Sequence, residues 1–265
     1  MAEKRATSVS LIVAVNDEEV FRDNLLASAS GQSDVEILPL RGFRSAGTAY
    51  SSGRAKARND ILIFAHQDVY FPPGWFSRFA DTVVDLESRD PNWGVLGVFG
   101  ISTSREPKGH VYSSGLMGIL GGAFQRPIEA STLDELILIV RRSSVLEFDR
   151  RLPGFHLYGA DICLQATHQE MKNYIIPAFC IHNSNGLRKL PLAFWRSYLY
   201  MQRKWWNQLP VTTPCIQITR TGFPFLSSMR TAASRALRRE KVGKRQKEPA
   251  TLYEDFRARI NAELP

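Results

Sequence analysis

The stretch NDILIFAHQDVYFPPGW, residues 59–75, contains a short apolar run that ends in polar residues. Residues 61–65 are a run of five apolar residues between polar neighbours, a pattern that indicates a strand buried on both faces. The run ends in His66, Gln67 and Asp68, and a Pro-Pro-Gly turn follows. An imidazole and a carboxylate two residues apart at the end of a core strand suggest that this end faces a ligand.

Short apolar runs alternate with polar, helix-compatible segments on both sides of this strand. We predict strands at 8–15, 35–40, 60–65 and 93–102, at the start of 133–148, and within 173–186. We predict helices at 17–30, 46–59, 74–88 and 157–171, and in the second half of 133–148. The pattern loosens over 103–130, where no element is predicted. This alternation predicts an α/β fold with a mostly parallel central sheet flanked by helices.

The composition is that of a globular protein. The 265 residues are 44% hydrophobic and 23% charged, enough for one large core or two small domains. No segment has the roughly 18–20 uncharged apolar residues of a membrane span, and no signal peptide is expected, because an acidic cluster follows the short apolar run at 9–15. Cys163, Cys180 and Cys215 are widely spaced, which predicts a reducing compartment without disulfides or a cysteine-based zinc site.

The positive charge is concentrated late in the chain. The net charge is +8, and residues 227–247 contain eight Lys or Arg and one Glu, which leaves 8 − 7 = +1 for everything else. Such a run is most often a solvated face, and attachment to a membrane surface is the alternative. Nucleic acid is not the expected partner.

Three regions follow from these patterns. Residues 1–186 form the predicted α/β domain. Residues 187–215 form a helical extension with aromatic and basic residues, either packed on that domain or lying at a membrane interface. Residues 216–265 form a basic, partly flexible tail.

Polar residues collect at the carboxyl ends of the predicted strands, where open α/β sheets bind ligands. These residues are Asn16, Asp17, Arg41, His66, Gln67, Asp68 and His182. Carboxylate and imidazole donors suit a divalent ion such as Mg²⁺ or Mn²⁺, which would neutralise charge on a phosphate leaving group. Asp161, near the start of the predicted helix 157–171, stands apart and is a candidate proton acceptor.

These motifs, in this order, resemble the family 2-type glycosyltransferases of the Rossmann-like GT-A fold, in the bacterial branch with His-Gln-Asp in place of Asp-x-Asp. VSLIVAVNDEEVF (9–21) resembles the opening strand that binds the nucleotide base. AYSSGRAKARNDILIFAHQDVYFPPGW (49–75) resembles the segment that ends in the diphosphate-binding motif, and YGADICLQATHQEMKNYIIPAFCIH (158–182) resembles the later catalytic segment.

The resemblance implies an inverting, metal-assisted transfer from a nucleotide-diphosphate sugar to a hydroxyl of a glycan or lipid-linked acceptor, in polysaccharide synthesis. It implies that Asp161 is the catalytic base and that Asp68 and His182 hold Mn²⁺ or Mg²⁺. Asp134 and Glu135 would border the acceptor. The implied donor-binding residues are Val15, Asn16, Asp17, Arg41, Arg54, His66, Gln67 and Asp68. A cytoplasmic location, peripheral to the inner face of a membrane, fits such an enzyme.

Alternatives remain at this stage. His66 replaces the first acid of Asp-x-Asp, and Ala160 stands where a Glu is commoner, so an inactive GT-A-like protein that binds a nucleotide or polyanion is the second hypothesis. A nucleotidyltransferase is disfavoured because an acidic segment, 16–21, follows the first strand.

Individual residues also have structural alternatives. Asp17 and Asp161 could stabilise helix starts, and His182 could simply end a strand. Arg54 could flank a helix, and Asp134 with Glu135 could form a solvated turn.

Overall fold

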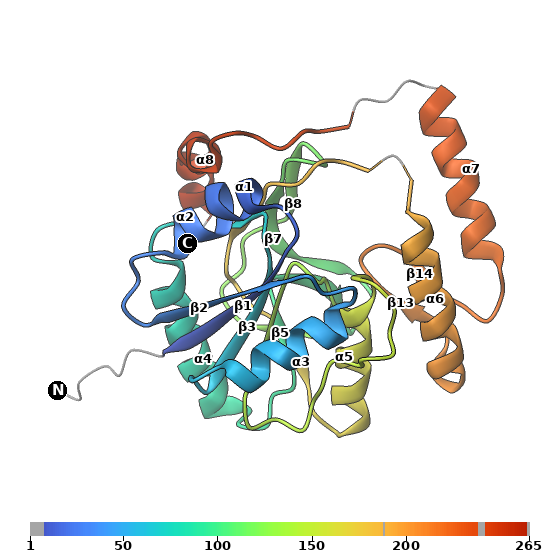
Figure 1. Cartoon of the computed structure of the whole chain (residues 1–265), viewed down its shortest axis with the longest axis horizontal. Coiled ribbons are helices and arrows are strands. Elements are labelled where there is room, and N and C mark those ends of the chain that lie inside the picture. Colours follow the sequence, from blue (N-terminus) through green and yellow to red (C-terminus); the bar gives the residue numbers. More distant parts are fainter. Residues whose placement is uncertain (1–7, 188, 238–241, 264–265) are drawn as a thin grey trace.

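The computed structural model describes residues 8–187, 189–237 and 242–263. A large mixed sheet forms the centre of the molecule, and helices lie on both sides of it (Figure 1). The helices are α1 (Glu18–Phe21), α2 (Ala27–Ala29), α3 (Ala46–Lys56), α4 (Trp75–Arg89), α5 (Tyr158–His168), α6 (Leu192–Lys204), α7 (Phe223–Leu237) and α8 (Pro249–Glu263), with a π-helical turn (Arg22–Leu26) between α1 and α2 and a 3₁₀ turn (Trp206–Gln208) after α6.

The strands of the sheet are β1 (Val9–Val15), β2 (Val35–Arg41), β3 (Ile61–His66), β4 (Val69–Tyr70), β5 (Leu96–Gly97), β6 (Phe99–Ser102), β7 (Pro107–Ser113), β8 (Gly118–Gly121), β9 (Ile128–Leu133), β10 (Ile137–Arg141), β11 (Asn173–Ile175) and β12 (Cys180–His182). Their order is β2-β1-β3-β10-β5-β11-β9-β6-β7-β12-β4, with β8 beside β7. A separate hairpin consists of β13 (Val211–Thr212) and β14 (Gln217–Ile218).

The predicted α/β class is confirmed, and the parallel part of the sheet is its N-terminal third. Strands β2, β1 and β3 pair in parallel, and their carboxyl ends therefore meet at one edge. Strand β10 then pairs antiparallel with β3, and most later pairs are antiparallel as well. The sheet is therefore mixed rather than mostly parallel.

Two apolar cores lie on opposite faces of the sheet. Alternate residues of β1 divide between them: Ile12 belongs to the core that contains α3 and α5, whereas Leu11 and Val13 belong to the core beneath α4. Helix α4 buries Trp75, Phe79, Val83 and Leu86, whose spacing of three to four residues places them on one face. Burial on both faces explains why β1 and β3 read as nearly continuous apolar runs.

The sequence patterns miss two features. Strands β7, β8 and β9 occupy the region where no element was predicted, because glycines interrupt its apolar pattern. At Gly109, φ is 143° and an added Cβ would lie 2.5 Å from the carbonyl of Val98, so close strand pairing requires glycine there. The helix predicted in the second half of 133–148 is absent, and β10 is followed by turns instead.

The C-terminal region folds back on the domain. Helix α6 buries Phe194, Tyr198 and Met201. The predicted loose tail contains α7 and α8. Leu252, Tyr253 and Phe256 of α8 pack against Phe179 and Ile181, which gives this helix an apolar face to bury. Residues 238–241 of the basic segment lie outside the described residues. Among the described helices, none is long and apolar enough to cross a membrane.

Candidate active site

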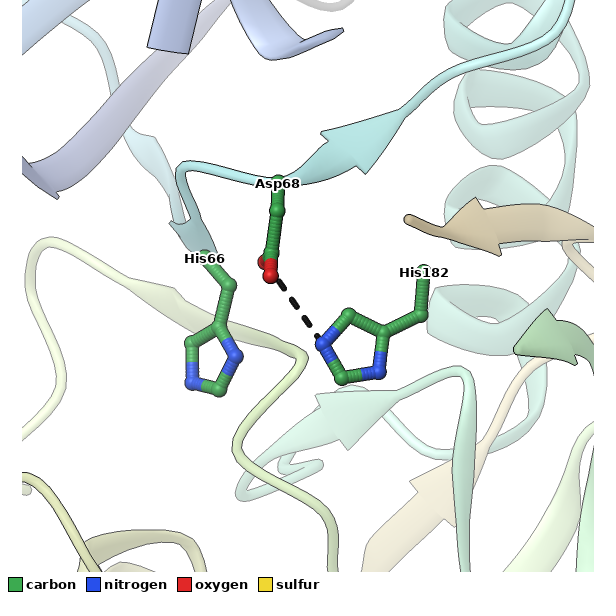
Figure 2. A group of neighbouring side chains, drawn as sticks. All are labelled: His66, Asp68 and His182. Carbon is green, nitrogen blue, oxygen red and sulfur yellow. Dashed lines mark ion pairs between the residues drawn. The ribbon is translucent and has the colours of Figure 1, made fainter. Parts of the chain in front are cut away.

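His66, Asp68 and His182 converge at the carboxyl end of the parallel strands. His66 ends β3, and Asp68 follows two residues later, so both side chains point to the same side (Figure 2). Strand β12 pairs antiparallel with β4, which places His182 opposite Val69, and the N–H of Asn183 donates to the carbonyl of Asp68 over 2.9 Å. One ligand atom from each of the three side chains lies within 4.8 Å of the others.

The charges of this group depend on one another. His182 Nε2 lies 3.5 Å from Asp68 Oδ1 (Figure 2). Burial by itself would raise the pKa of Asp68, but His182 holds that pKa well below its usual range. Burial opposes the charged form of His182, yet the Asp68 carboxylate raises its pKa overall. Burial lowers the pKa of His66. The site therefore combines an ionised carboxylate with an imidazole that favours the neutral form.

Tyr158 fixes the orientation of His66. The Tyr158 hydroxyl lies 3.1 Å from His66 Nε2 and donates to the carbonyl of Glu135 over 3.2 Å. In the tautomer in which His66 Nε2–H donates to this hydroxyl, the lone pair on Nδ1 is open to a ligand. A histidine that ligates a metal through one nitrogen characteristically donates its other N–H in this way. The hydrogen bond therefore fits His66 as a metal ligand.

These three side chains fit a divalent cation. Two imidazoles and one carboxylate offer nitrogen and oxygen donors, and the short separations allow one ion to bridge them. Among the described residues, a search for three or more His, Cys, Asp or Glu side chains close enough to bind one metal ion finds this group.

A cavity of about 250 Å³ adjoins this group at the ends of β1, β2 and β3. Phe43 and Phe155 supply aromatic surface on its wall, and His66 and Asp68 supply the polar side. The complete lining is Ala14, Val15, Asn16, Leu40, Phe43, Tyr50, His66, Gln67, Asp68 and Phe155. Five of the predicted donor-binding residues therefore lie together, namely Val15, Asn16, His66, Gln67 and Asp68.

Gln67 organises the loop after β1. Its Oε1 accepts from the backbone N–H groups of Asn16 and Asp17 over 2.9 and 3.2 Å, and its Nε2 donates to Asn16 Oδ1. Asp17 caps α1 by accepting from the N–H of Val20 over 3.1 Å. Gln67 thus ties the ends of β1 and β3 together at the edge of the cavity.

The structure does not place the two predicted donor-binding arginines at the cavity. Arg41 makes a two-pronged ion pair with Glu18, with distances of 2.5 and 2.9 Å. Arg54 donates to backbone carbonyls of Arg142, Ser144 and Leu146. The Arg54 guanidinium therefore holds the loop after β10, and Arg54 does not line the cavity.

Asp161 also departs from its predicted role. Its side chain is 1% exposed. Lys204 Nζ lies 2.7 Å from Oδ1, Trp205 Nε1 donates to Oδ1 over 2.8 Å, and Gln165 Nε2 donates to Oδ2 over 2.8 Å. Both oxygens are therefore engaged, and an acceptor hydroxyl cannot reach either of them in this arrangement. Lys204 also donates to Asp149 over 2.8 Å, so one ammonium joins two carboxylates.

Asp134 and Glu135 lie in the turn between β9 and β10. The backbone N–H groups of Leu157 and Gly159 at the start of α5 favour the charged form of Glu135, but burial raises its pKa overall. Asp134 accepts from the N–H of Leu136 through Oδ1 over 3.0 Å. Its charge favours the protonated forms of both His66 and His182.

Sequence reasoning missed Tyr158, Phe43 and Phe155. The signal for Tyr158 was present, because it directly precedes Gly159 at the start of the predicted helix, but a tyrosine in an apolar context reads as core. The two phenylalanines lie in loops, where no periodicity marks the direction of a side chain.

Comparisons with known proteins agree with the fold. No family model matches the chain. A protein of Fuscovulum blasticum named "ATP synthase subunits region ORF 6" is 32% identical over 136 residues, which cover 49% of this chain and 53% of that protein. The chain thus spans about half the length of the curated relative that it matches.

Among solved structures, GalNAc-T7 with UDP, GalNAc and Mn²⁺ matches with a TM-score of 0.51 and 10% identity, over 78% of this chain and 49% of that one. TarS (residues 1–349) of S. aureus matches with a TM-score of 0.45 and 11% identity, over 66% and 60%. The match to GalNAc-T7 supports the GT-A fold for this chain.

The network around Asp149 gives a test of how Asp161 is held. Burial alone would raise the pKa of Asp149, but hydrogen bonds from Lys204, the N–H of Arg151 and Tyr200 hold that pKa well below its usual range. Its stabilising effect is therefore complete above the unfolded pKa of about 3.9 and is lost as the pH falls through the lower folded value. We expect Asp149→Asn to lower the free energy of unfolding by about 2 kcal/mol at pH 7.

Urea denaturation of wild type and variant between pH 3 and pH 8 measures this difference, which should shrink below about pH 4. Asp85→Asn, which removes an exposed ion pair with Arg89, is the control and should change stability by less than about 0.5 kcal/mol. A penalty for Asp149→Asn that stays constant to the acid limit would contradict the assignment.

Proposed function

We propose that this protein transfers a sugar from a nucleotide-diphosphate sugar to a hydroxyl group of a glycan or lipid-linked acceptor. The observation that carries this proposal is the meeting of His66, Asp68 and His182 beside a cavity whose wall includes His66, Asp68 and aromatic side chains. A nucleotide sugar needs an apolar slot for its base and a cationic site for its diphosphate. The GT-A fold and the complex of GalNAc-T7 with UDP and Mn²⁺ support the proposal.

The donor lies with its base between Phe43 and Phe155 and its diphosphate beside Asp68 in this proposal. A divalent ion held by His66, Asp68 and His182 would neutralise the charge of the departing diphosphate. Imidazole nitrogen is a poor ligand for Mg²⁺ and a better one for Mn²⁺, so the donor set favours Mn²⁺. Gln67 keeps the β1 loop in place, and Tyr158 keeps His66 in the tautomer that leaves Nδ1 open.

Asp134 is the proposed base of an inverting single displacement. Its Oδ1 is fixed by the N–H of Leu136, whereas the backbone N–H groups of Leu157 and Gly159 bind the carboxylate of Glu135. Asp134 lies two residues before Leu136, whose carbonyl accepts from the N–H of His66 over 3.1 Å, and its charge favours the protonated forms of His66 and His182. It would take the proton of the acceptor hydroxyl as the oxygen attacks the anomeric carbon. Asp161 would then have a structural role.

A peripheral membrane contact is the proposed setting. The large apolar side chains exposed on α6, α7 and the segments next to them are Leu187, Leu192, Leu199, Trp206, Phe223, Phe225, Leu226 and Met229. No Asp or Glu occurs between Glu170 and Glu240, whereas residues 187–239 contain ten Lys or Arg. Apolar side chains on a basic background fit the surface of an anionic lipid bilayer. Helix α7 lies at the outer side of α6 in Figure 1, and its Phe223, Leu226 and Met229 are more than half exposed.

Donor binding tests the proposal directly. We expect UDP, GDP or dTDP to release heat on titration into the wild type when Mn²⁺ is present and to bind much more weakly without it. Asp68→Asn should weaken that binding by at least about tenfold, because it removes the carboxylate ligand. Asp60→Asn removes a carboxylate that is 92% exposed and should bind as the wild type does.

Binding of a nucleotide without hydrolysis or transfer of any matching nucleotide sugar would favour an inactive nucleotide-binding protein. Failure of all three nucleotides to bind with any metal would refute the donor site.

The base assignment is tested by two matched variants. Asp134→Asn should lower kcat for transfer, or for hydrolysis of the donor, by about 10²- to 10⁴-fold while the nucleotide affinity changes little. Asp161→Asn breaks a buried ion pair and should instead lower the free energy of unfolding by about 3–5 kcal/mol. A normally active Asp134→Asn together with a stable but inactive Asp161→Asn would return the base role to Asp161.

Lipid binding is tested by co-sedimentation with vesicles. We expect binding to vesicles that contain phosphatidylglycerol and little binding to pure phosphatidylcholine vesicles. The double variant Phe223→Ser, Leu226→Ser should lose most of that binding, because both side chains are more than 60% exposed. Val84→Ser, Val145→Ser removes equally exposed apolar residues elsewhere and should have no effect. Equal sedimentation of both double variants would exclude this surface as the contact.

A further inference from the structure

The segment after α7 returns to the candidate active site. Residues 242–247, which we call the C-terminal strap, belong to the connection that leads from α7 back toward α8 (Figure 1). The N–H of Gly243 donates to the carbonyl of Gly115 over 3.1 Å, and the N–H of Gly186 donates to the carbonyl of Gly243 over 2.9 Å. A Cβ at Gly243 would lie 1.7 Å from the carbonyl oxygen of Ser114, so this contact requires glycine.

Asn183 fixes the position of the strap relative to the metal ligands. Its amide makes two hydrogen bonds with the backbone of Gln246: the N–H of Gln246 donates to Oδ1, and Nδ2 donates to the carbonyl, both over 2.8 Å. Asn183 is fully buried and directly follows His182, and its own N–H binds the carbonyl of Asp68. The strap is therefore held by the residue that also joins the two strands carrying the candidate ligands.

Arg245 projects from this strap to the His-Asp-His group. Its Nε donates to the carbonyl of Asn183 over 3.0 Å, which fixes the plane of the guanidinium. One terminal nitrogen lies 3.8 Å from Asp68 Oδ2, too far for a hydrogen bond. Within the part of the chain that the structure describes, neither terminal nitrogen donates a hydrogen bond. The side chain is 28% exposed, so these donors remain open to a ligand.

The charges around Arg245 indicate the side on which an anion would bind. On one side Arg245 itself lines a hollow of about 230 Å³, whose wall also includes Asp17, Glu19 and Asp23, and these carboxylates would repel a phosphate. On the other side lie Asp68 and the two histidines, where a bound cation would leave positive charge. An anion in contact with Arg245 is therefore favoured on the side of the candidate metal site.

We propose that Arg245 is a donor-site residue that binds the diphosphate of the nucleotide sugar, and that the C-terminal strap exists to deliver it. This inference rests on the proposed function. Arginine presents parallel N–H groups that match two phosphate oxygens, and it retains its charge throughout the reaction. It would hold the diphosphate from the side opposite the cation and stabilise the negative charge of the leaving group. The basic C-terminal region would thus complete the donor site.

Calorimetric titration of the full chain in the presence of Mn²⁺ tests this inference. The probes are whichever of UDP, GDP and dTDP binds the wild type, the matching nucleoside, and inorganic pyrophosphate. Arg245→Met should weaken binding of the nucleoside diphosphate and of pyrophosphate by about 10- to 100-fold and leave nucleoside binding unchanged. Arg245→Lys, which keeps the charge but not the paired donors, should recover part of the loss.

Lys244→Met is the matched control, because Lys244 is the exposed neighbour on the same strap, and it should bind every probe as the wild type does. Unchanged near-ultraviolet circular dichroism of Arg245→Met would show that the fold is intact, and Arg245→Lys serves as the informative variant if the fold is not.

Wild-type affinity of Arg245→Met for both phosphate probes would overturn the inference. If the wild type binds pyrophosphate but no nucleotide, the proposed function fails, and the pyrophosphate titrations still judge Arg245. If the wild type binds neither probe, both proposals fall.

Discussion

The short antiparallel pairing of β4 with β12 is the constraint on which the site depends. It places His182 beside Asp68 and turns two separate strand ends into one group of ligands. The hydrogen bond from the N–H of Asn183 to the carbonyl of Asp68 fixes the register, and a shift of one residue would point His182 to the other face. The side-chain amide of Asn183 then positions the C-terminal strap from the same place.

A second set of contacts connects the C-terminal helices with the α/β domain. Lys204 and Trp205, at the end of α6, bind the buried carboxylate of Asp161 at the start of α5. A buried carboxylate without such partners would be strongly destabilising, so α6 and α5 stabilise each other. Helix α5 in turn carries Tyr158, whose hydroxyl orients His66. The helical extension therefore supports the geometry of the candidate metal ligands through α5 and Tyr158.

The partners of each carboxylate distinguish Asp161, Glu135 and Asp134, which the sequence alone does not rank. Asp161 has the partners of a structural carboxylate, with a cation and two N–H donors on a buried side chain. Glu135 lies against the backbone N–H groups at the start of α5, and Asp134 is the one whose charge acts on both histidines. Catalytic roles in such a site depend on which oxygens remain available to a substrate, and a motif does not record that.

The sequence by itself determined the elements whose signals are local. The apolar runs at 9–15 and 61–65 and the spacing of Trp75, Phe79, Val83 and Leu86 define strands and a helix through periodicity that each segment carries alone. The parallel pairing predicted for the first strands also implied that Asn16, Gln67 and Asp68 meet at one edge. Only the tertiary structure decided that Arg54 and Asp161 hold the fold together, that Tyr158 orients His66, and that Arg245 returns to the site. Those roles depend on partners far away in the chain, and the direction of a side chain in a loop or at a helix start is set by packing rather than by local pattern.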